Sequence, residues 1–333
     1  MTAEGLGGEA RVLVTGGSGF IGTNLVESQL RVGRPVLNVD RSPPRNGAHE
    51  PHWRRMDMLD RNGLARLVSE FGPTHVLHMA ARTDLDSDEV SSYASNLAGV
   101  ENLIAGLSEV RSLERVVFAS SRLVCKIGYV PRSETDYCPS TAYGASKVEG
   151  ERIVRAAGDL RVPWTIVRPT SVWGPWFDVP YRAFFTAVAR GRYVHPRGAR
   201  VRKSFGFVGN TVHQLERLLE APAETVDHRT LYLGDDPPLL LHDWVERIRR
   251  ALDAPSVHSV PVPLLRVAAT AGTWMQRLGW DEAPLTRFRL DNLLTEMVYD
   301  LAPLHEIVGP PPFALDEGIR ETAAWLRSEG HAA

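Results

Sequence analysis

The sequence predicts an α/β fold: a doubly wound parallel sheet of the Rossmann type, with a smaller, partly discontinuous C-terminal domain. Three observations predict it. Short apolar strands alternate with amphipathic helices through about the first 170 residues, as in a parallel sheet covered by helices on both faces. The first strand runs directly into a glycine-rich turn, Thr15 to Gly22. After about residue 172 the alternation gives way to segments rich in proline and aromatic residues.

Hydrophobic periodicity places the individual elements. The expected strands are 11–16, 35–40, 53–56, 74–81, 115–121, 164–168 and 230–233. The expected helices are 20–31, 61–70, 90–107, 143–157, 181–190, 210–221, 241–252, 264–277, 285–297 and 315–328. The Pro- and Gly-rich stretch 41–51 is expected to be a loop.

The glycine turn joins the first strand to the first helix. Gly16 permits a tight turn, Gly19 lets the backbone approach a pyrophosphate, and Gly22 allows close packing of the helix. Phe20 and Ile21 open the helix, whose N-terminus attracts negative charge. The turn therefore predicts a dinucleotide site, although a plain tight turn between a strand and a helix would look similar.

An acidic residue ends the second expected strand. Asp40 lies 18 residues beyond Gly22, near the spacing of about 20 at which a carboxylate meets the adenosine ribose. A carboxylate there repels a 2′-phosphate, so NAD is favoured over NADP, whereas the following Arg41 could tolerate that phosphate. The alternative is that Asp40 only forms a turn.

Composition excludes several classes of protein. The formal net charge of the 333 residues is −2, so no basic field points to nucleic acid or an anionic membrane. The only cysteines, Cys125 and Cys138, resemble no metal or disulfide framework. The eleven histidines lack metal spacing, and no metal is expected.

Without a signal peptide or an apolar run of spanning length, we expect a cytoplasmic protein. The most lipophilic stretch, Val260 to Leu278, is expected to be a packed helix, or else a surface that touches a partner or membrane.

The candidate catalytic residues follow the strand 115–121. This strand ends in Ser121, and Tyr143 and Lys147 lie one turn apart on the next expected helix. A tyrosine ionises near pH 10. A nearby ammonium group and a positive nicotinamide ring would lower the pKa of Tyr143 and make the phenol a base. Ser121 could bond the same substrate oxygen. The alternative is an ordinary amphipathic helix face.

These residues carry a resemblance to a known family. The chain resembles the extended short-chain dehydrogenases/reductases, in particular the NAD-dependent epimerase/dehydratase group that acts on nucleotide sugars. The matching segments are Thr15 to Gly22, His78 to Ala81, Val117 to Ser121, Tyr143 to Lys147, and Arg168 to Pro175. The resemblance implies further cofactor contacts from Asp57, Met58, Ala80, Ala81, Asn96, Lys147 and Pro169. It also implies a homodimer formed through the helices 90–107 and 143–157.

Departures from the family pattern narrow the reaction. Dehydratases place Asp-Glu after the catalytic hydroxyl residue and decarboxylases keep the glutamate, but this chain has Arg122 and Leu123 there. Both chemistries are therefore disfavoured. Oxidation and reduction at one carbon remain. Asp40 favours an NAD-dependent epimerase of a nucleotide sugar, because a retained NAD suits that cycle. The alternatives are a one-way dehydrogenase or keto-reductase of a sugar nucleotide or other alcohol, and a cofactor-binding regulatory or scaffold protein.

Cations are expected to hold the substrate, because arginine suits phosphate oxygens. The candidates are Arg82, Arg122, Arg202, Lys203 and Arg287, together with Ser121. The alternative is a solvated surface charge, because the chain is rich in arginine and most arginines are of that kind. We expect residues 1–172, with a return at about 204–235, to form the NAD-binding domain, and residues 173–203 and 236–333 to form mainly the substrate-binding domain.

Overall fold

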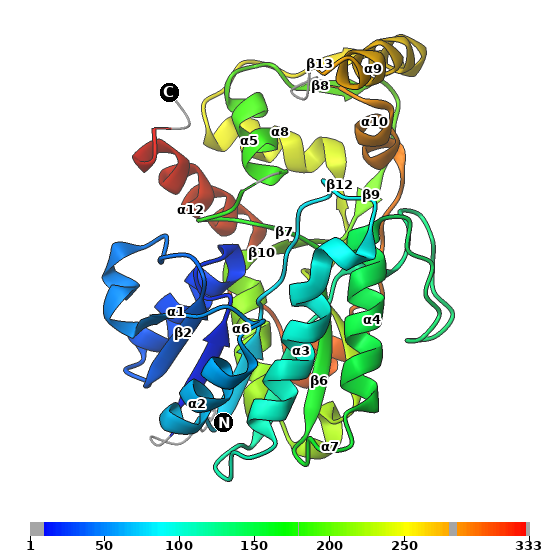
Figure 1. Cartoon of the computed structure of the whole chain (residues 1–333). Coiled ribbons are helices and arrows are strands. Elements are labelled where there is room, and N and C mark those ends of the chain that lie inside the picture. The colour runs from blue at the N-terminus through cyan, green and yellow to red at the C-terminus, as the bar shows by residue number, and fades with distance from the viewer. Residues whose placement is uncertain (1–9, 179, 280–284, 331–333) are drawn as a thin grey trace. The chain divides into compact units, whose positions relative to one another are not determined.

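The computed structural model describes residues 10–178, 180–279 and 285–330 (Figure 1). These residues divide into two compact units. The first unit comprises 10–177, 206–235 and 300–313, and the second comprises the other described residues between 178 and 330. Among the described residues, no helix is both long and apolar enough to cross a membrane.

A seven-stranded parallel sheet forms the centre of the first unit, which confirms the expected fold class. Its strand order is β11-β6-β5-β4-β1-β2-β3. The strands are β1 (Val12–Thr15), β2 (Val36–Asp40), β3 (Trp53–Arg55), β4 (His75–His78), β5 (Arg115–Ala119), β6 (Trp164–Pro169) and β11 (Arg229–Leu233). The strand order reverses between β1 and β4, and parallel sheets bind ligands at the carboxyl ends of the strands on either side of such a reversal.

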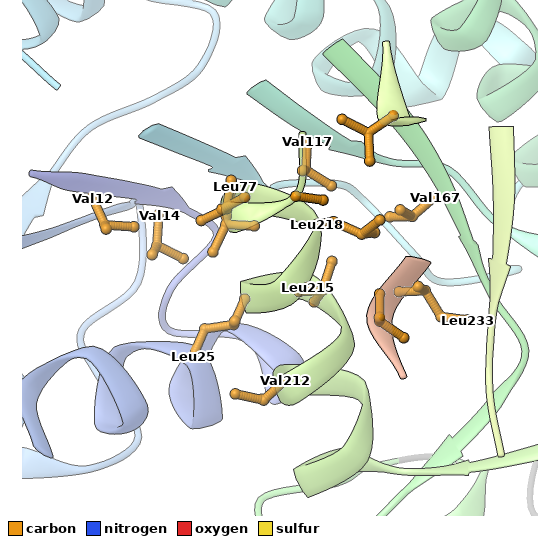
Figure 2. Close-up of a cluster of buried hydrophobic side chains, with 14 of the residues drawn as sticks. Val12, Val14, Leu25, Leu77, Val117, Val167, Val212, Leu215, Leu218 and Leu233 are labelled. Atoms are coloured by element: carbon orange, nitrogen blue, oxygen red, sulfur yellow. The ribbon is translucent and has the colours of Figure 1, made fainter. Parts of the chain in front are cut away.

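Helices cover both faces of this sheet. Alternate residues along a strand point to opposite faces, so Val12 and Val14 belong to one buried cluster and Leu13 to the other. Figure 2 shows the first cluster, in which strand valines meet Leu25 and Leu215 from two helices. Its helices are α1 (Phe20–Arg31), α6 (Val208–Glu220) and α11 (Ala302–Val308). The opposite cluster packs under α2 (Arg61–Phe71), α3 (Ala94–Leu107) and α4 (Ala142–Ala156).

The structure differs from the expected elements at a few points. Two expected strands stop early, since β4 ends at His78 and β5 at Ala119. A short helix, α11, lies within a proline-rich stretch for which no element was expected. The smaller elements of this part of the chain are η1 (Gly47–His52), η2 (Val90–Tyr93), η3 (Arg122–Val124), β7 (Ser171–Trp173), β10 (Phe205–Phe207) and α7 (Ala223–Val226).

The second unit is built around an aromatic core. Trp244 is fully buried, with its ring 4.0 Å from that of Phe205 and 5.2 Å from that of Phe184. The helices are α5 (Tyr181–Ala189), α8 (Leu241–Ala251), α9 (Val262–Arg277), α10 (Arg287–Leu294) and α12 (Leu315–Ser328). Two strand pairs complete it: β8 (Val194–Pro196) with β13 (His258–Val260), and β9 (Arg202–Lys203) with β12 (Leu239–Leu240).

Helix α9 occupies the most lipophilic stretch of the sequence. Its inner face is packed as expected, because Leu265 and Ala269 are buried against Leu290 of α10. Its outer face exposes large apolar side chains, among them Val267 and Trp274.

Candidate active site

The glycine turn of the first unit has no room for side chains at Gly16 and Gly22. Gly16 has a φ of +71°, and a Cβ there would lie 2.6 Å from the backbone nitrogen of Ala80. A Cβ on Gly22 would run into the carbonyl oxygen of Gly16. Gly19 is the N-cap of α1 and has no side chain with which to cap it. The helix N-terminus with its Phe20 and Ile21 amides is therefore built like an anion site.

Replacing Gly22 by alanine is expected to destabilise the first unit by about 1–3 kcal/mol, the usual cost of overpacking. The new methyl group would push the start of α1 away from the turn. Gly47→Ala is the matched control, because a Cβ on Gly47 meets nothing within 4 Å among the described residues. Denaturant unfolding measures both variants, and equal stability of the two would refute this account of the turn.

Asp40 is fixed against the same turn. One carboxylate oxygen accepts a hydrogen bond from the Ser18 amide at 3.1 Å, and the other accepts one from the Ser42 amide at 2.9 Å. The neighbouring Arg41 is exposed. Arg45, which the sequence analysis missed, donates from Nε to the carbonyl oxygen of Ser18 at 3.2 Å. A basic residue five positions after an acidic strand end was a weak signal for it.

Asn96 fastens the end of β4 to α4. Its Oδ1 accepts from the Arg82 amide at 2.8 Å, and its Nδ2 donates to the Arg82 carbonyl at 2.9 Å and to Ser146 Oγ at 3.0 Å. Ala80 and Ala81 lie in the segment held in this way, and the Ala80 amide faces Gly16. These bonds keep the loop after β4 beside the glycine turn.

Two further expected cofactor residues lie between β3 and α2. Asp57 is exposed, and its Oδ1 accepts from the Leu59 amide at 2.9 Å. Met58 is buried, and its carbonyl oxygen accepts from Asn102 Nδ2 at 3.0 Å. Pro169, at the end of β6, is half-buried. The structure thus places Asp57 and Met58 in the loop that follows β3, and Pro169 as the last residue of β6.

Ser121, Tyr143 and Lys147 come together at the carboxyl end of β5. Thr141 caps α4 by accepting from the Gly144 amide at 3.0 Å, which sets the start of the helix just before Tyr143. Tyr143 and Lys147 lie one turn apart, are both buried, and face the sheet. The side chains of Ser121 and Tyr143 share a hydrogen bond. Lys147 Nζ donates to the Ala119 carbonyl, the last of β5, at 2.8 Å.

Burial dominates the ionisation of this trio. It raises the pKa of Tyr143 to about 12, against the opposing effects of the Ser121 hydrogen bond and the Arg122 charge. Burial also lowers the pKa of Lys147 to about 8, and the carboxylate of Glu151 acts in the other direction. In the chain alone, Ser121 and Arg122 are the groups that lower the pKa of Tyr143, while the Lys147 ammonium group donates to a backbone carbonyl. The expected effect of Lys147 on Tyr143, together with the nicotinamide charge, stays a prediction.

A buried ion pair lies next to the trio, one turn further along α4. Arg168 of β6 donates from Nε and Nη2 to the two carboxylate oxygens of Glu151, each at 2.8 Å, and both side chains are 1% exposed. Ser120 Oγ and the Tyr137 hydroxyl donate to the same carboxylate at 2.6 and 2.9 Å. Glu151 lies one turn beyond Lys147 on α4. The network therefore joins the end of β5, β6 and α4 next to the candidate catalytic residues.

The cations expected at the substrate are engaged with neighbours of their own. Arg82 forms a two-point ion pair with Asp84, at 2.8 and 3.0 Å, and its guanidinium lies over the Tyr93 ring. Arg122 opens η3 directly after Ser121, and its charge acts on Tyr143. Both belong to the first unit.

The other three expected cations belong to the second unit. Arg202 is exposed and pairs with Glu296 at 3.1 Å. Lys203 is buried, and its Nζ donates to the Asn292 carbonyl at 2.6 Å. Arg287 is exposed, and its Nε donates to Thr270 Oγ1 at 3.0 Å. The described residues of the chain contain no cluster of histidine, cysteine or acidic side chains that could hold a metal ion.

Buried histidines make the stability depend on pH. Burial first, and then the Lys147 charge, lower the pKa of His78 to about 3, while its ring bonds Thr15 Oγ1 at 2.7 Å. An unfolded histidine binds a proton near pH 6.5. The stability that neutral His78 contributes is therefore present above about pH 6.5 and is lost as the pH falls toward about 3.

We expect the His78→Gln variant to lose less stability than the wild type between about pH 7.5 and about pH 5. Denaturant midpoints at the two pH values measure this loss. His258→Gln, at an exposed position of β13, is the control and should behave as the wild type. Equal pH slopes for all three proteins would contradict the assignment to His78.

A parallel sheet with a glycine turn, an acidic strand end and a Ser-Tyr-Lys trio is the kind of site found in oxidoreductases that use a nucleotide cofactor. The model of the NAD dependent epimerase/dehydratase family matches residues 12–234. The chain belongs to this family.

Three comparisons extend over nearly the whole chain. A 2-alkyl-3-oxoalkanoate reductase of Stenotrophomonas maltophilia is 26% identical, over 94% of this chain and 98% of that protein. A UDP-glucose 4-epimerase of Vibrio cholerae is also 26% identical, over 94% of both proteins. The crystal structure of a Thermus thermophilus UDP-glucose 4-epimerase, solved as a complex with NAD, matches with a TM-score of 0.72 and 25% identity, over 95% of this chain and 99% of that chain.

Proposed function

We propose that this protein is an NAD-dependent epimerase of a nucleotide-diphosphate sugar. The observation that carries the proposal is the meeting of Ser121, Tyr143 and Lys147 at the end of β5, in the same compact unit as the glycine turn and Asp40. A phenol, a hydroxyl group and an ammonium group beside a dinucleotide site suit the oxidation of a substrate alcohol. The UDP-glucose 4-epimerase relatives support the sugar substrate.

The residues of the first unit fit NAD. A Cβ at Gly16 or Gly22 would collide with the backbone that forms the turn, and the N-terminus of α1, which no side chain caps, suits a pyrophosphate. Asp40, anchored by two amides, places a carboxylate where it would accept from the ribose hydroxyls. NAD supplies a nicotinamide ring that accepts a hydride from the substrate carbon and returns it.

The protein's own residues would move the proton. Ser121 would hydrogen-bond the reacting hydroxyl of the sugar and hold it beside Tyr143. Because burial keeps the pKa of Tyr143 near 12, the phenol needs additional positive charge before it becomes a base at neutral pH. With NAD bound, Tyr143 would lose its proton more readily while the neighbouring nicotinamide is positively charged, and would regain it once that charge is neutralised. Tyr143 would thus act first as base and then as acid.

Lys147 would hold the ribose of the nicotinamide while bound to the Ala119 carbonyl. Asn96 and Glu151 act indirectly, by fixing α4 against the ends of β4 and β5. We also propose that the chain dimerises through α3 and α4, which lie side by side on one face of the sheet (Figure 1).

Epimerisation is favoured over elimination by the residues after Ser121. Arg122 and Leu123 form the start of η3, where elimination would need a carboxylic acid or base. In epimerisation the keto sugar turns over and receives the hydride on its other face, which requires no further acid.

A panel of UDP-, GDP-, CDP- and dTDP-sugars, each with NAD or NADP, tests the proposal. Absorbance at 340 nm follows net reduction of the cofactor, and NMR identifies the sugar. A new stereoisomer without net NADH supports the epimerase and identifies its substrate. If the protein is folded and binds NAD but converts no sugar of the panel, the epimerase proposal is contradicted.

A one-way dehydrogenase or reductase is the second candidate. The observation that favours it is the 26% identity to a 2-alkyl-3-oxoalkanoate reductase over nearly the full chain. The same Ser-Tyr-Lys trio would serve a single hydride transfer, with a cofactor that then dissociates. Net accumulation of NADH with a ketone product, in place of an epimer, would establish this alternative.

A further inference from the structure

The only two cysteines of the chain lie opposite each other in the structure. Cys125 and Cys138 form an isolated β-bridge and are both free thiols. The Cys138 amide donates to the Val124 carbonyl at 3.0 Å, and the Lys126 amide donates to the Cys138 carbonyl at 2.6 Å. No disulfide was expected from the sequence, because a spacing of 13 residues says nothing about pairing.

This backbone pairing is compatible with a disulfide. Paired strands lie about 4.8 Å apart, and disulfides join residues whose Cα atoms are about 4.4–6.8 Å apart. Directly paired residues also project their side chains from the same face of the bridge. The Cβ atoms need to approach to about 3.8 Å, and the chain from 126 to 138 contains no helix or strand that would resist this approach.

The two thiols have different environments. Cys125 is 3% exposed, packs with Val124 and Val148, and donates its S–H to the Asp136 carbonyl at 3.3 Å. Cys138 is only partly buried. An external disulfide would therefore meet Cys138 first, and the protected Cys125 would then displace the reagent.

Both cysteines adjoin the candidate catalytic site. Cys125 is the C-cap of η3, the short helix that begins directly after Ser121. Cys138 follows Tyr137, whose hydroxyl donates to Glu151 in the network beneath Lys147. A covalent bond between the two cysteines would thus pull on segments that position Ser121 and the start of α4.

We propose that Cys125 and Cys138 are a reversible disulfide pair that lowers turnover when oxidised. The disulfide itself is independent of the proposed function, whereas its effect on turnover rests on that function. The oxidant is a low-molecular-weight disulfide such as oxidised glutathione.

The reaction proceeds in two exchange steps. The Cys138 thiolate attacks one sulfur of the reagent, which forms a mixed disulfide and releases one thiol. The Cys125 thiolate then attacks the Cys138 sulfur, which forms the Cys125–Cys138 bond and releases the second thiol. The two cysteines lose two electrons and two protons, and the reagent gains them.

Mass spectrometry of the folded full chain tests the pairing directly. The protein is incubated with oxidised glutathione, alkylated with iodoacetamide under denaturing conditions and weighed intact. We expect a monomer that has lost two hydrogen atoms, carries no alkyl group and recovers both thiols in dithiothreitol. Two alkylated thiols, a stable glutathione adduct or disulfide-linked chains would each overturn the pairing.

Turnover measurements test the link to the site, with the Cys138→Ser variant as control. The oxidised wild type should turn over about tenfold more slowly or worse, because small displacements of reacting groups are costly, and dithiothreitol should restore it. Cys138→Ser should keep its activity in the oxidant. Full activity of the oxidised wild type would refute the effect on turnover. Failure of the proposed function is distinguished by the mass measurement, which needs no substrate.

Discussion

Replacing Tyr143 by phenylalanine is expected to lower turnover by about 10²–10⁴-fold, the usual contribution of a positioned acid–base group. The variant loses only the hydroxyl group that hydrogen-bonds Ser121. The ring remains buried beside Tyr93, at a centroid distance of 6.1 Å, so the fold should be retained. Steady-state kinetics and calorimetric titration with NAD measure the two properties separately, and NAD affinity should change little.

Tyr129→Phe is the matched control for this substitution. The Tyr129 hydroxyl donates to Asp136 at 3.0 Å in the segment after η3, and it takes no part in the trio. We expect its turnover to stay near that of the wild type. Unchanged turnover of Tyr143→Phe would contradict the catalytic assignment, and unchanged cellular function of a variant that still binds NAD would support the scaffold alternative.

Replacing Glu151 by glutamine is expected to destabilise the protein by about 3–5 kcal/mol, because the Arg168 guanidinium would be left buried without its counter-charge. Both side chains are 1% exposed, and four donors converge on the carboxylate from Arg168, Ser120 and Tyr137. The amide of glutamine would also turn a donor toward groups that themselves donate. Denaturant unfolding at neutral pH measures the loss.

The same helix offers a matched control. Glu149 pairs with Arg152 at 2.6 Å, but both side chains are largely exposed. Glu149→Gln should therefore cost only about 0–1 kcal/mol, as is usual for a surface pair. Similar losses in the two variants would show that the Glu151 pair is no more important to stability than a surface contact.

The double variant Glu151→Gln, Arg168→Met separates a lost interaction from a stranded charge. Because it removes the guanidinium together with its partner, we expect it to regain part of the stability lost by Glu151→Gln. A double variant that is less stable than the single one would indicate that Arg168 stabilises mainly through its other contacts, such as that with Tyr232.

The sheet and its main helices could be predicted because their signals are local. Apolar strand runs such as the one ending at Thr15 are too short and too β-branched for helices. The glycines that follow it are typical of a tight turn between a strand and a helix. Tyr143 and Lys147 could be paired because a helix fixes the geometry of residues four apart. Helix α11 escaped prediction because Pro303 and the prolines after it suggested a loop, although proline is tolerated in a first helical turn.

The partners of the site residues could not be predicted, because long-range pairing leaves no mark on spacing. The sequence shows Glu151 and Arg168 but not that they meet across α4 and β6. It shows Arg82 but not that Asp84 occupies its guanidinium group. The effect of burial on Tyr143 depends on everything packed around it, so the sequence showed only the charges that would lower its pKa and not the burial that raises it.

Isotope transfer tests the central claim most directly. The nucleotide sugar identified by the panel is prepared with deuterium at the reacting carbon and converted with NAD by the wild-type protein. The account predicts that the epimer keeps its deuterium at that carbon, because one cofactor accepts and returns the same hydride. Deuterium found in free NADH, or exchanged into solvent, would contradict a retained-cofactor epimerase acting through Tyr143.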